Sequence, residues 1–230
     1  MEKETILDKI TKVVTIAGNF IMMNVLFLLA ALPIVTMGQA WTALMTAIRY
    51  NIRGDKWLDG FKEGYKTRFL RGVLSWLLML VLTAIMLFDV MTYTAVEAFS
   101  VELVIRLVMS CLMFALVAGF TVALLLLNVY IPTDTGRWIS NAASMVFKAP
   151  LLLAIAGVAL WLPLLLAIFY YNIFYYCIMI FVAAYFTLAA LAITLLMKET
   201  LIHYLLEARA NGTLLGDREM TEEDEENGEN

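Results

Sequence analysis

The chain has 230 residues, of which 63% are hydrophobic and only 16% are charged. Soluble globular domains carry about 25% charged residues, so this composition excludes an ordinary soluble domain and favours an integral membrane protein. The formal net charge of −4 is unevenly distributed, because residues 217–230 hold eight acidic residues against Arg218, while residues 1–216 are net +3.

Long apolar runs with almost no charge follow one another along the chain. A helix of roughly 20 residues rises about 30 Å, which is the thickness of the hydrocarbon core of a bilayer. We predict an all-α transmembrane helix bundle over residues 1–200, with spans near residues 13–32, 34–50, 72–94, 105–127, 151–170 and 174–197. A cytoplasmic helical extension is expected over residues 201–216, followed by a disordered acidic tail over residues 217–230.

Residues 34–50 are the uncertain span, because they are only moderately apolar. Lys and Arg near helix ends favour the cytoplasmic side of a membrane. If this segment crosses, there are six spans, both termini are cytoplasmic, and 15 of the 16 basic residues lie inside. If it lies flat as an interfacial helix, there are five spans and the basic residues divide 12 to 4. The charge distribution favours six spans in a multi-pass protein of the cell membrane.

The start of this segment contains two local signals. Pro33 is expected to end the first helix. Thr36 and Gln39 have the spacing of a capping box, which predicts a structural role for Gln39 rather than contact with a substrate. Small residues, which allow membrane helices to approach closely, recur at every fourth position: Gly38, Thr42 and Thr46.

Residues 51–71 form the most distinctive polar stretch. Aromatic residues recur at every fourth position, with basic residues beside them: Trp57, Phe61, Tyr65 and Phe69, and Lys62 and Lys66. Such a pattern is typical of a helix that lies in the membrane interface. We predict an amphipathic cytoplasmic helix, and two readings stay open: an anchor facing lipid and a docking surface for a partner. Interleaved acidic residues argue against nucleic-acid binding.

Charged and amide side chains inside the apolar runs are the next candidates for function. Asp89 and Arg106 lie almost symmetrically about the expected turn between the third and fourth spans, so they are predicted to pair as a clasp in this hairpin. A transport site is the less favoured reading of the same two residues. Asn19, Asn24 and Asn128 are expected to form hydrogen bonds between helices.

The sequence offers no recognisable pattern for catalysis, metal binding or cofactor binding. His203 is the only histidine, and the two cysteines lie in separate apolar runs. Enzymatic chemistry would need paired carboxylates, a nucleophile with its base, or a metal cluster. We therefore expect no enzyme activity, no catalytic or metal site and no cofactor.

Several residues described above form one pattern in the first third of the chain. Asn24 precedes the run from Leu32 through Pro33, Thr36 and Gly38, and the pattern continues with Ala43-Leu44 and the stretch from Phe61 to Lys66. This pattern resembles the N-terminal signature of the YesL-like family of bacterial integral membrane proteins, the domain of unknown function 624. Gly64 stands where many members carry Asn. The resemblance covers about the first 75 residues.

The resemblance implies a cellular context and not a reaction. Genes of this family often neighbour those of carbohydrate ABC transporters, solute-binding proteins and glycoside hydrolases in Gram-positive bacteria. We therefore expect a non-enzymatic accessory or assembly partner of an ABC-type carbohydrate uptake system. The alternative is an autonomous small transporter or channel acting as a homo-oligomer. The expected partners are the lipid bilayer, carbohydrate ABC transporter subunits and further copies of this chain, but not nucleic acid.

Overall fold

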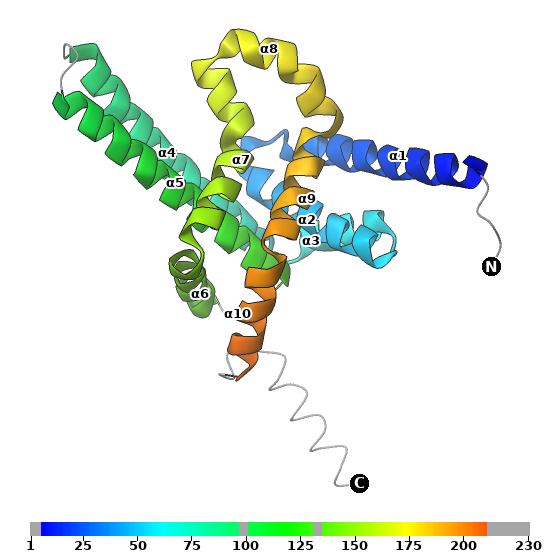
Figure 1. The fold of residues 1–230 in the computed structure, drawn as a ribbon. Helices are drawn as coiled ribbons and strands as arrows, with labels where there is room; N and C mark the ends of the chain where they lie inside the picture. Colours follow the sequence, from blue (N-terminus) through cyan, green and yellow to red (C-terminus); the bar gives the residue numbers. More distant parts are fainter. Residues whose placement is uncertain (1–5, 97–100, 131–134, 211–230) are drawn as a thin grey trace.

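The computed structural model describes residues 6–96, 101–130 and 135–210, and the regular secondary structure in these ranges is entirely helical (Figure 1). The elements are α1 (Ile6–Ala31), the 3-10 turn η1 (Ile34–Thr36), α2 (Met37–Arg53), α3 (Trp57–Lys66), α4 (Phe69–Val96), α5 (Val101–Tyr130), α6 (Thr135–Lys148), α7 (Pro150–Phe169), α8 (Tyr171–Ile180), the π-helix η2 (Phe181–Tyr185), α9 (Phe186–Leu196) and α10 (Lys198–Ala210).

Helix α2 occupies the centre of the molecule. Every residue from Gly38 to Ile48 is buried, because α1, α3, α4, α5 and α9 pack around this helix. The moderate hydropathy of residues 34–50 therefore belongs to a helix surrounded by protein. Helix α2 ends at Gly54, whose φ of 85° is the left-handed conformation that glycine adopts readily at a helix C-terminus.

By length and composition, two described helices can cross a membrane: residues Val14–Ala31 of α1, and α5. Two further candidates are bent pairs. Helix α3 meets α4 at 74°, and α6 meets α7 at 109°, so counting each pair as one span gives up to four. Apolar helices of this kind are compatible with a multi-pass membrane protein. Six crossings and an interfacial helix remain predictions.

The predicted last span, residues 174–197, is a composite structure. It consists of α8, the π-helix η2 and α9 in succession. Helix α10 then begins at Lys198 and ends at Ala210, inside the expected extension of residues 201–216. The acidic tail of residues 217–230 lies outside the described residues.

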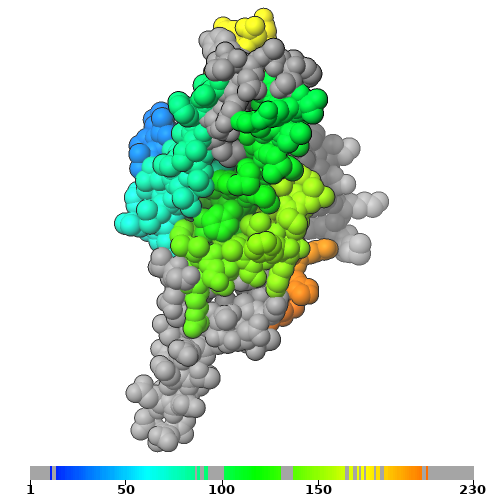
Figure 2. All heavy atoms as spheres, turned by 90° about the vertical axis from the view of Figure 1, so that its left-hand side faces the viewer, coloured from blue at the N-terminus to red at the C-terminus, as the bar shows by residue number. Residues whose placement is uncertain are grey.

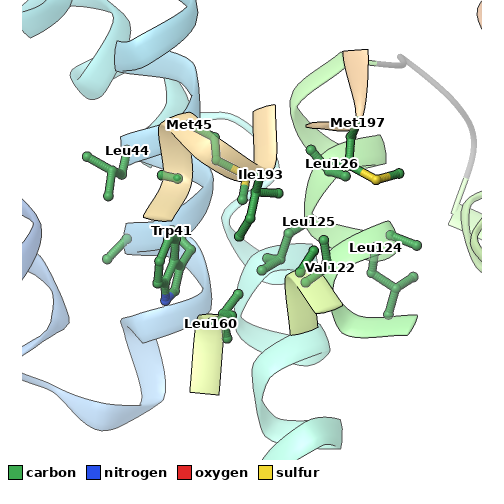
Figure 3. Packing of buried hydrophobic residues seen from close by; sticks show 14 of the residues in the cluster. Trp41, Leu44, Met45, Val122, Leu124, Leu125, Leu126, Leu160, Ile193 and Met197 are labelled. Carbon is green, nitrogen blue, oxygen red and sulfur yellow. The ribbon is translucent and has the colours of Figure 1, made fainter. Parts of the chain in front are cut away.

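The hydrophobic core lies where α2, α5, α7 and α9 meet. Trp41, Leu125, Leu160 and Ile193, one from each helix, are fully or almost fully buried and converge in Figure 3. The Trp41 ring also lies 5.1 Å from the ring of Phe27 on α1. This core fixes α2, and α3 packs against α2 in turn.

The outward surface of α4 and α5 is apolar. Figure 2 shows these two helices on one face of the molecule, with α8 at one end and α6 towards the other. Large exposed side chains follow both helices, including Leu74, Leu78, Val81 and Ile85 on α4 and Val104, Val108 and Leu112 on α5. Contiguous exposed apolar surface marks contact with a membrane or with another protein.

Candidate functional site: the junction of α2, α3 and α4

The turn between α1 and α2 is closed by Thr36. Its hydroxyl lies 2.9 Å from the carbonyl oxygen of Ala30 and 2.8 Å from that of Pro33, and donates to this pair. Thr36 makes no side-chain capping bond to α2. The predicted capping box of Thr36 and Gln39 is therefore wrong, because the hydroxyl is engaged on the α1 side of the turn.

Gln39 instead caps a helix 25 residues away. Its amide Nε2 lies 2.7 Å from the carbonyl oxygen of Gly64, 2.9 Å from that of Tyr65 and 3.1 Å from that of Thr67. The last carbonyls of a helix have no partner within the helix, so the amide satisfies groups that the end of α3 leaves open. The predicted structural role of Gln39 is confirmed, with different partners.

Two close helix approaches hold this junction together. A Cβ added at Gly38 would lie 2.3 Å from the carbonyl oxygen of Gly72, so α2 and α4 are in backbone contact there. A Cβ added at Gly64 would lie 2.7 Å from the Cβ of Thr46, which brings α3 equally close to α2. The small residues of α2 therefore allow the close approach of neighbouring helices that their spacing predicts.

The predicted aromatic stripe is divided between the inside and the outside of the molecule. Phe61 is 5% exposed and packs in the core, Trp57 and Tyr65 are half-buried, and Phe69 belongs to α4 and is exposed. The rings still follow one another, at 6.5 Å from Phe61 to Tyr65 and 5.8 Å from Tyr65 to Phe69. Phe61 is thus unavailable to a partner or to lipid in this fold, whereas Lys62 and Lys66 are exposed.

Two arginines join this junction to the carboxyl end of α5. Arg49 of α2 donates to the carbonyl of Val129 at 3.0 Å, and Arg68 donates to that of Asn128 at 3.3 Å. A cation at a helix C-terminus is favourable, because it meets both the open carbonyls and the negative end of the helix dipole. Burial lowers the pKa of Arg68, and the neighbouring charge of Arg71 lowers it further.

A second side-chain amide, that of Asn24, links α1 to the π-helix η2 and to α9. Its Nδ2 donates to the carbonyl of Phe181 at 3.0 Å, and its Oδ1 accepts the backbone N–H of Thr187 at 3.1 Å. Phe181 is the first residue of the π-helix and Thr187 lies two residues after its end, so Asn24 bonds to both sides of a segment where the regular pattern of helix bonds is interrupted. The prediction that Asn24 bonds between helices is confirmed. Asn128 approaches Thr42 at 3.5 Å, a weaker contact.

Of the two side chains in the predicted clasp of Asp89 and Arg106, the structure describes only that of Arg106. Arg106 forms a salt bridge of 2.6 Å with Glu102, one turn earlier on α5. The side chain of Asp89 lies outside the described residues. The pairing across the hairpin stays a prediction, with Glu102 as an additional partner that the i, i+4 spacing on a helix makes available.

Sequence reasoning missed Arg49, Arg68 and the true partners of Gln39. From the sequence, Arg49 and Arg68 were expected only to be cytoplasmic charges. No local pattern indicates that a carbonyl 60 or 80 residues away will accept their hydrogen bonds. Among the side chains within the described ranges, no group of three or more His, Cys, Asp or Glu is arranged to hold a metal ion.

A protein-family model matches the part of the chain that contains this junction. Residues 20–90 match the model of DUF624, described as a protein of unknown function. The match includes Asn24, the turn at Pro33 and Thr36, Gly38, Gln39 and all of α3. Searches of curated proteins and of solved structures each found no match. This match agrees with the resemblance seen in the sequence, and the matched residues 20–90 include the junction of α2, α3 and α4.

Proposed function

We propose that this chain is a non-enzymatic accessory or assembly partner of an ABC-type carbohydrate uptake system, and that the outer face of α3 contacts the transporter. One observation supports this proposal above the others. Helix α3 is fixed on its inner side by Phe61, Gly64 and the amide of Gln39, while Lys62 and Lys66 are exposed on its other side.

A fixed helix with an exposed charged face suits recognition of another protein. Little conformational entropy is lost when a surface is already ordered before binding, so more of the interaction energy contributes to affinity. Positive side chains at such a surface favour a partner with acidic groups and increase the rate of association. The carbohydrate context comes from the family resemblance, whose members' genes neighbour such transporters.

The proposal includes a topology in which α3 faces the cytoplasm, as do both chain termini. The distribution of Lys and Arg supports this orientation in the cell membrane. The test is a Thr5→Cys variant without the native cysteines, exposed to a membrane-impermeant thiol reagent in intact cells. Protection before lysis and labelling after lysis are expected. Labelling in intact cells would contradict the six-span orientation.

The partner is tested by purifying the tagged protein from its native host in mild detergent and identifying copurifying proteins by mass spectrometry. Near-stoichiometric recovery of permease or ATPase subunits is expected. The variant Lys62→Glu/Lys66→Glu should lose these subunits, because both exposed positive charges of α3 are reversed. Lys148→Glu/Lys198→Glu, which reverses two exposed lysines on α6 and α10, is the matched control and should retain them.

Phe61→Ala is unsuitable for this experiment, because Phe61 belongs to the core and its loss would disturb folding. Equal recovery of transporter subunits with both charge-reversed variants would contradict α3 as the contact. Recovery of the chain alone, as a defined homo-oligomer, would contradict the accessory role and favour an autonomous transporter or channel.

A further inference from the structure

The inner side of α6 is held against the end of α5. Trp138, Ala142 and Met145 recur at helical spacing and are buried. The indole of Trp138 donates to the carbonyl of Leu124 on α5 at 3.0 Å. The rotation of α6 about its own axis is therefore fixed by the protein, and the side chains on its other sides are the ones available for contact with the surroundings.

The outward half of α6 divides into an apolar side and a basic side. Ile139 and Phe147 are exposed, and Phe147 is 86% exposed. Each residue of an α-helix turns by about 100°, so Ile139 lies on the opposite side of the helix from Arg137 and Lys148, and Phe147 lies between them. A helix at the edge of a membrane protein needs this arrangement, with an apolar side towards the lipid tails and a basic side towards headgroups and water.

Helix α7 turns away from α6 and runs beside α5. A Cβ added at Gly119 of α5 would lie 3.0 Å from the carbonyl carbon of Leu153 on α7, and the rings of Phe114 and Trp161 lie 6.0 Å apart. These contacts follow in opposite order along the two helices, so α7 is antiparallel to α5. Since α5 can cross a membrane and α6 meets α7 at 109°, α6 lies close to the plane of the bilayer when α5 and α7 cross it.

The exposed apolar side chains continue along α7 directly after α6. They recur at helical spacing on one side of that helix: Leu151, Ile155, Val158 and Leu162. Helix α7 has 20 residues and no charged residue. Its length of about 30 Å equals the thickness of the hydrocarbon core. The two ends of α7 therefore reach the two surfaces of a bilayer.

Helix α8 lies at the other end of α7 from α6 (Figure 1). It has no charged residue, and each of its side chains that the structure describes is at least partly exposed. Exposed tyrosines stand out: Tyr170 just before the helix, Tyr175, and Tyr176, which is 81% exposed. Tyrosine is enriched where a membrane meets water, because its ring is apolar and its hydroxyl is polar. The exposed side chains of α8 are thus those of a helix at a membrane surface.

We propose that α6 and α8 are surface helices that contact the lipid headgroup region on opposite faces of the bilayer, with α7 crossing between them. Arg137 and Lys148 give α6 a charge opposite to that of lipid phosphate. The distribution of Lys and Arg along the chain favours the cytoplasmic leaflet for α6, which leaves the outer leaflet for α8. The inference concerns lipid and is independent of the proposed transporter partner.

Few acidic residues accompany the basic side of α6. Helices α6 and α7 have none, and Glu102 belongs to the opposite end of α5, where it bridges Arg106. Asp134, just before α6, lies outside the described residues. The helices that pack on α6 are α5 and α7, and other acidic residues belong to other helices: Asp59 and Glu63 of α3 and Glu199 of α10. The charge of α6 therefore suits a negatively charged surface.

The test measures the membrane depth of single spin labels. Depth follows from the accessibility of each label to oxygen, which concentrates in lipid, and to a water-soluble nickel complex. The full-length protein, in a background of Cys111→Ser/Cys177→Ala, is placed in nanodiscs of phosphatidylcholine and phosphatidylglycerol. Labels at Ile139→Cys and Phe147→Cys should lie at similar depth, just below the headgroups, although these positions are about 12 Å apart along the helix.

The matched control is Arg137→Cys, which lies two residues from Ile139 but on the basic side of α6. Its label should be accessible to nickel and poorly accessible to oxygen. Ile155→Cys, on the exposed side of α7, should lie in the hydrocarbon core, and Tyr176→Cys on α8 should return to headgroup depth. Unchanged melting temperatures would show that the labelled variants retain the fold.

Three outcomes would overturn the proposal. Depths at Ile139 and Phe147 that differ by about 12 Å would mean that α6 enters the membrane as part of one broken span with α7. Equal access of nickel to labels at Ile139 and Arg137 would place the whole outer half of α6 in water. A label at Tyr176 in the hydrocarbon core would make α8 part of a crossing helix.

A second measurement needs no variant. The unsubstituted protein in the same nanodiscs is modified with a lipid-soluble or a water-soluble carbene reagent, and the modified residues are identified by mass spectrometry. The lipid-soluble reagent should modify Ile139 and Phe147, and the water-soluble reagent should modify Arg137. The reverse pattern would contradict α6 as a surface helix. Neither measurement includes a transporter, so failure here is distinguishable from failure of the proposed function.

Discussion

The two buried amides, Gln39 and Asn24, hold irregular helix segments in different ways. The Gln39 amide nitrogen faces three carbonyl oxygens at the end of α3, while its Oε1 is buried without a hydrogen-bond partner in the described part of the chain. Asn24 both donates and accepts at the π-helix, and the hydroxyl of Thr187 adds a further contact to the carbonyl of Phe20. The amide nitrogen of Gln39 is thus the one side-chain donor at these carbonyls of the α3 end, whereas the joint at the π-helix has several contacts.

The largest expected effect is that of Gln39→Glu. A carboxylate would place negative charge against three carbonyl oxygens in a buried site, which should lower the free energy of unfolding by about 3–5 kcal/mol. Gln39→Met removes the hydrogen bonds without adding charge and should cost about 1–3 kcal/mol. Unfolding in detergent mixtures measures both, and equal stability of the two variants would contradict the one-donor account.

Gly38→Ala should have the next largest effect. The added Cβ would meet the backbone of Gly72 and the Cβ of Trp76 at 2.6 Å, so α2 and α4 must separate. Overpacking of this kind costs about 1–3 kcal/mol. Gly18→Ala on α1 is the matched control, since nothing lies within 4 Å of its added Cβ, and helix propensity predicts a small gain. Thermal unfolding of both should show opposite shifts.

Asn24→Leu is expected to cost less, about 1 kcal/mol, because hydrogen bonds between membrane helices contribute modestly. The variant Asn24→Asp tests the donor bond to the Phe181 carbonyl separately. A neutral carboxylic acid can still donate to Phe181 and accept from Thr187, while the ionised form cannot donate. Melting of Asn24→Asp should therefore match the unchanged protein at acidic pH and fall towards neutral pH. A melting temperature independent of pH would argue that the donor bond to Phe181 contributes nothing.

The smallest expected effect is that of Glu102→Gln. Its salt bridge with Arg106 is exposed and follows i, i+4 spacing, so its loss should cost only about 0.3–0.5 kcal/mol. The predicted pairing of Asp89 with Arg106 is tested in the same assay. Asp89→Asn should be more destabilising than Glu102→Gln and should be non-additive with Arg106→Gln. Additive effects would remove Asp89 from the clasp.

Sequence periodicity and hydropathy predicted the existence of most long helices but not the environment of α2. The apolar runs near residues 72–94, 105–127 and 151–170 correspond to α4, α5 and α7, because a long apolar run has few alternatives to helix. From the sequence, α2 was ambiguous between crossing the membrane and lying flat; the structure shows that other helices enclose it, and the choice between the two stays a prediction. Its polar side chains have partners distant in sequence, which no local pattern encodes.

The candidate site was predictable only in outline. The family signature drew attention to Asn24, Pro33, Thr36 and Gly38, and the structure gives each a packing or hydrogen-bonding role. The aromatic stripe indicated a helix over α3, yet the periodicity could not assign Phe61 to the core. Burial of that face depends on Gly60 and Gly64 lying against Tyr50 and Thr46 of α2, a tertiary contact.

The π-helix sets the rotational phase of the chain that follows it. Each residue of an α-helix turns by about 100°, so the extra residue in a π turn offsets everything after it by that angle. Phe186 now faces the rings of Phe27 and Trp41, at 4.7 Å and 5.9 Å. In an uninterrupted α-helix of the same length, Phe186 would be turned away from this aromatic group, whereas deleting one residue within Phe181–Tyr185 would restore regular α-helix and leave Phe186 facing it. The π turn therefore absorbs one extra residue while the same side of α9 stays inside.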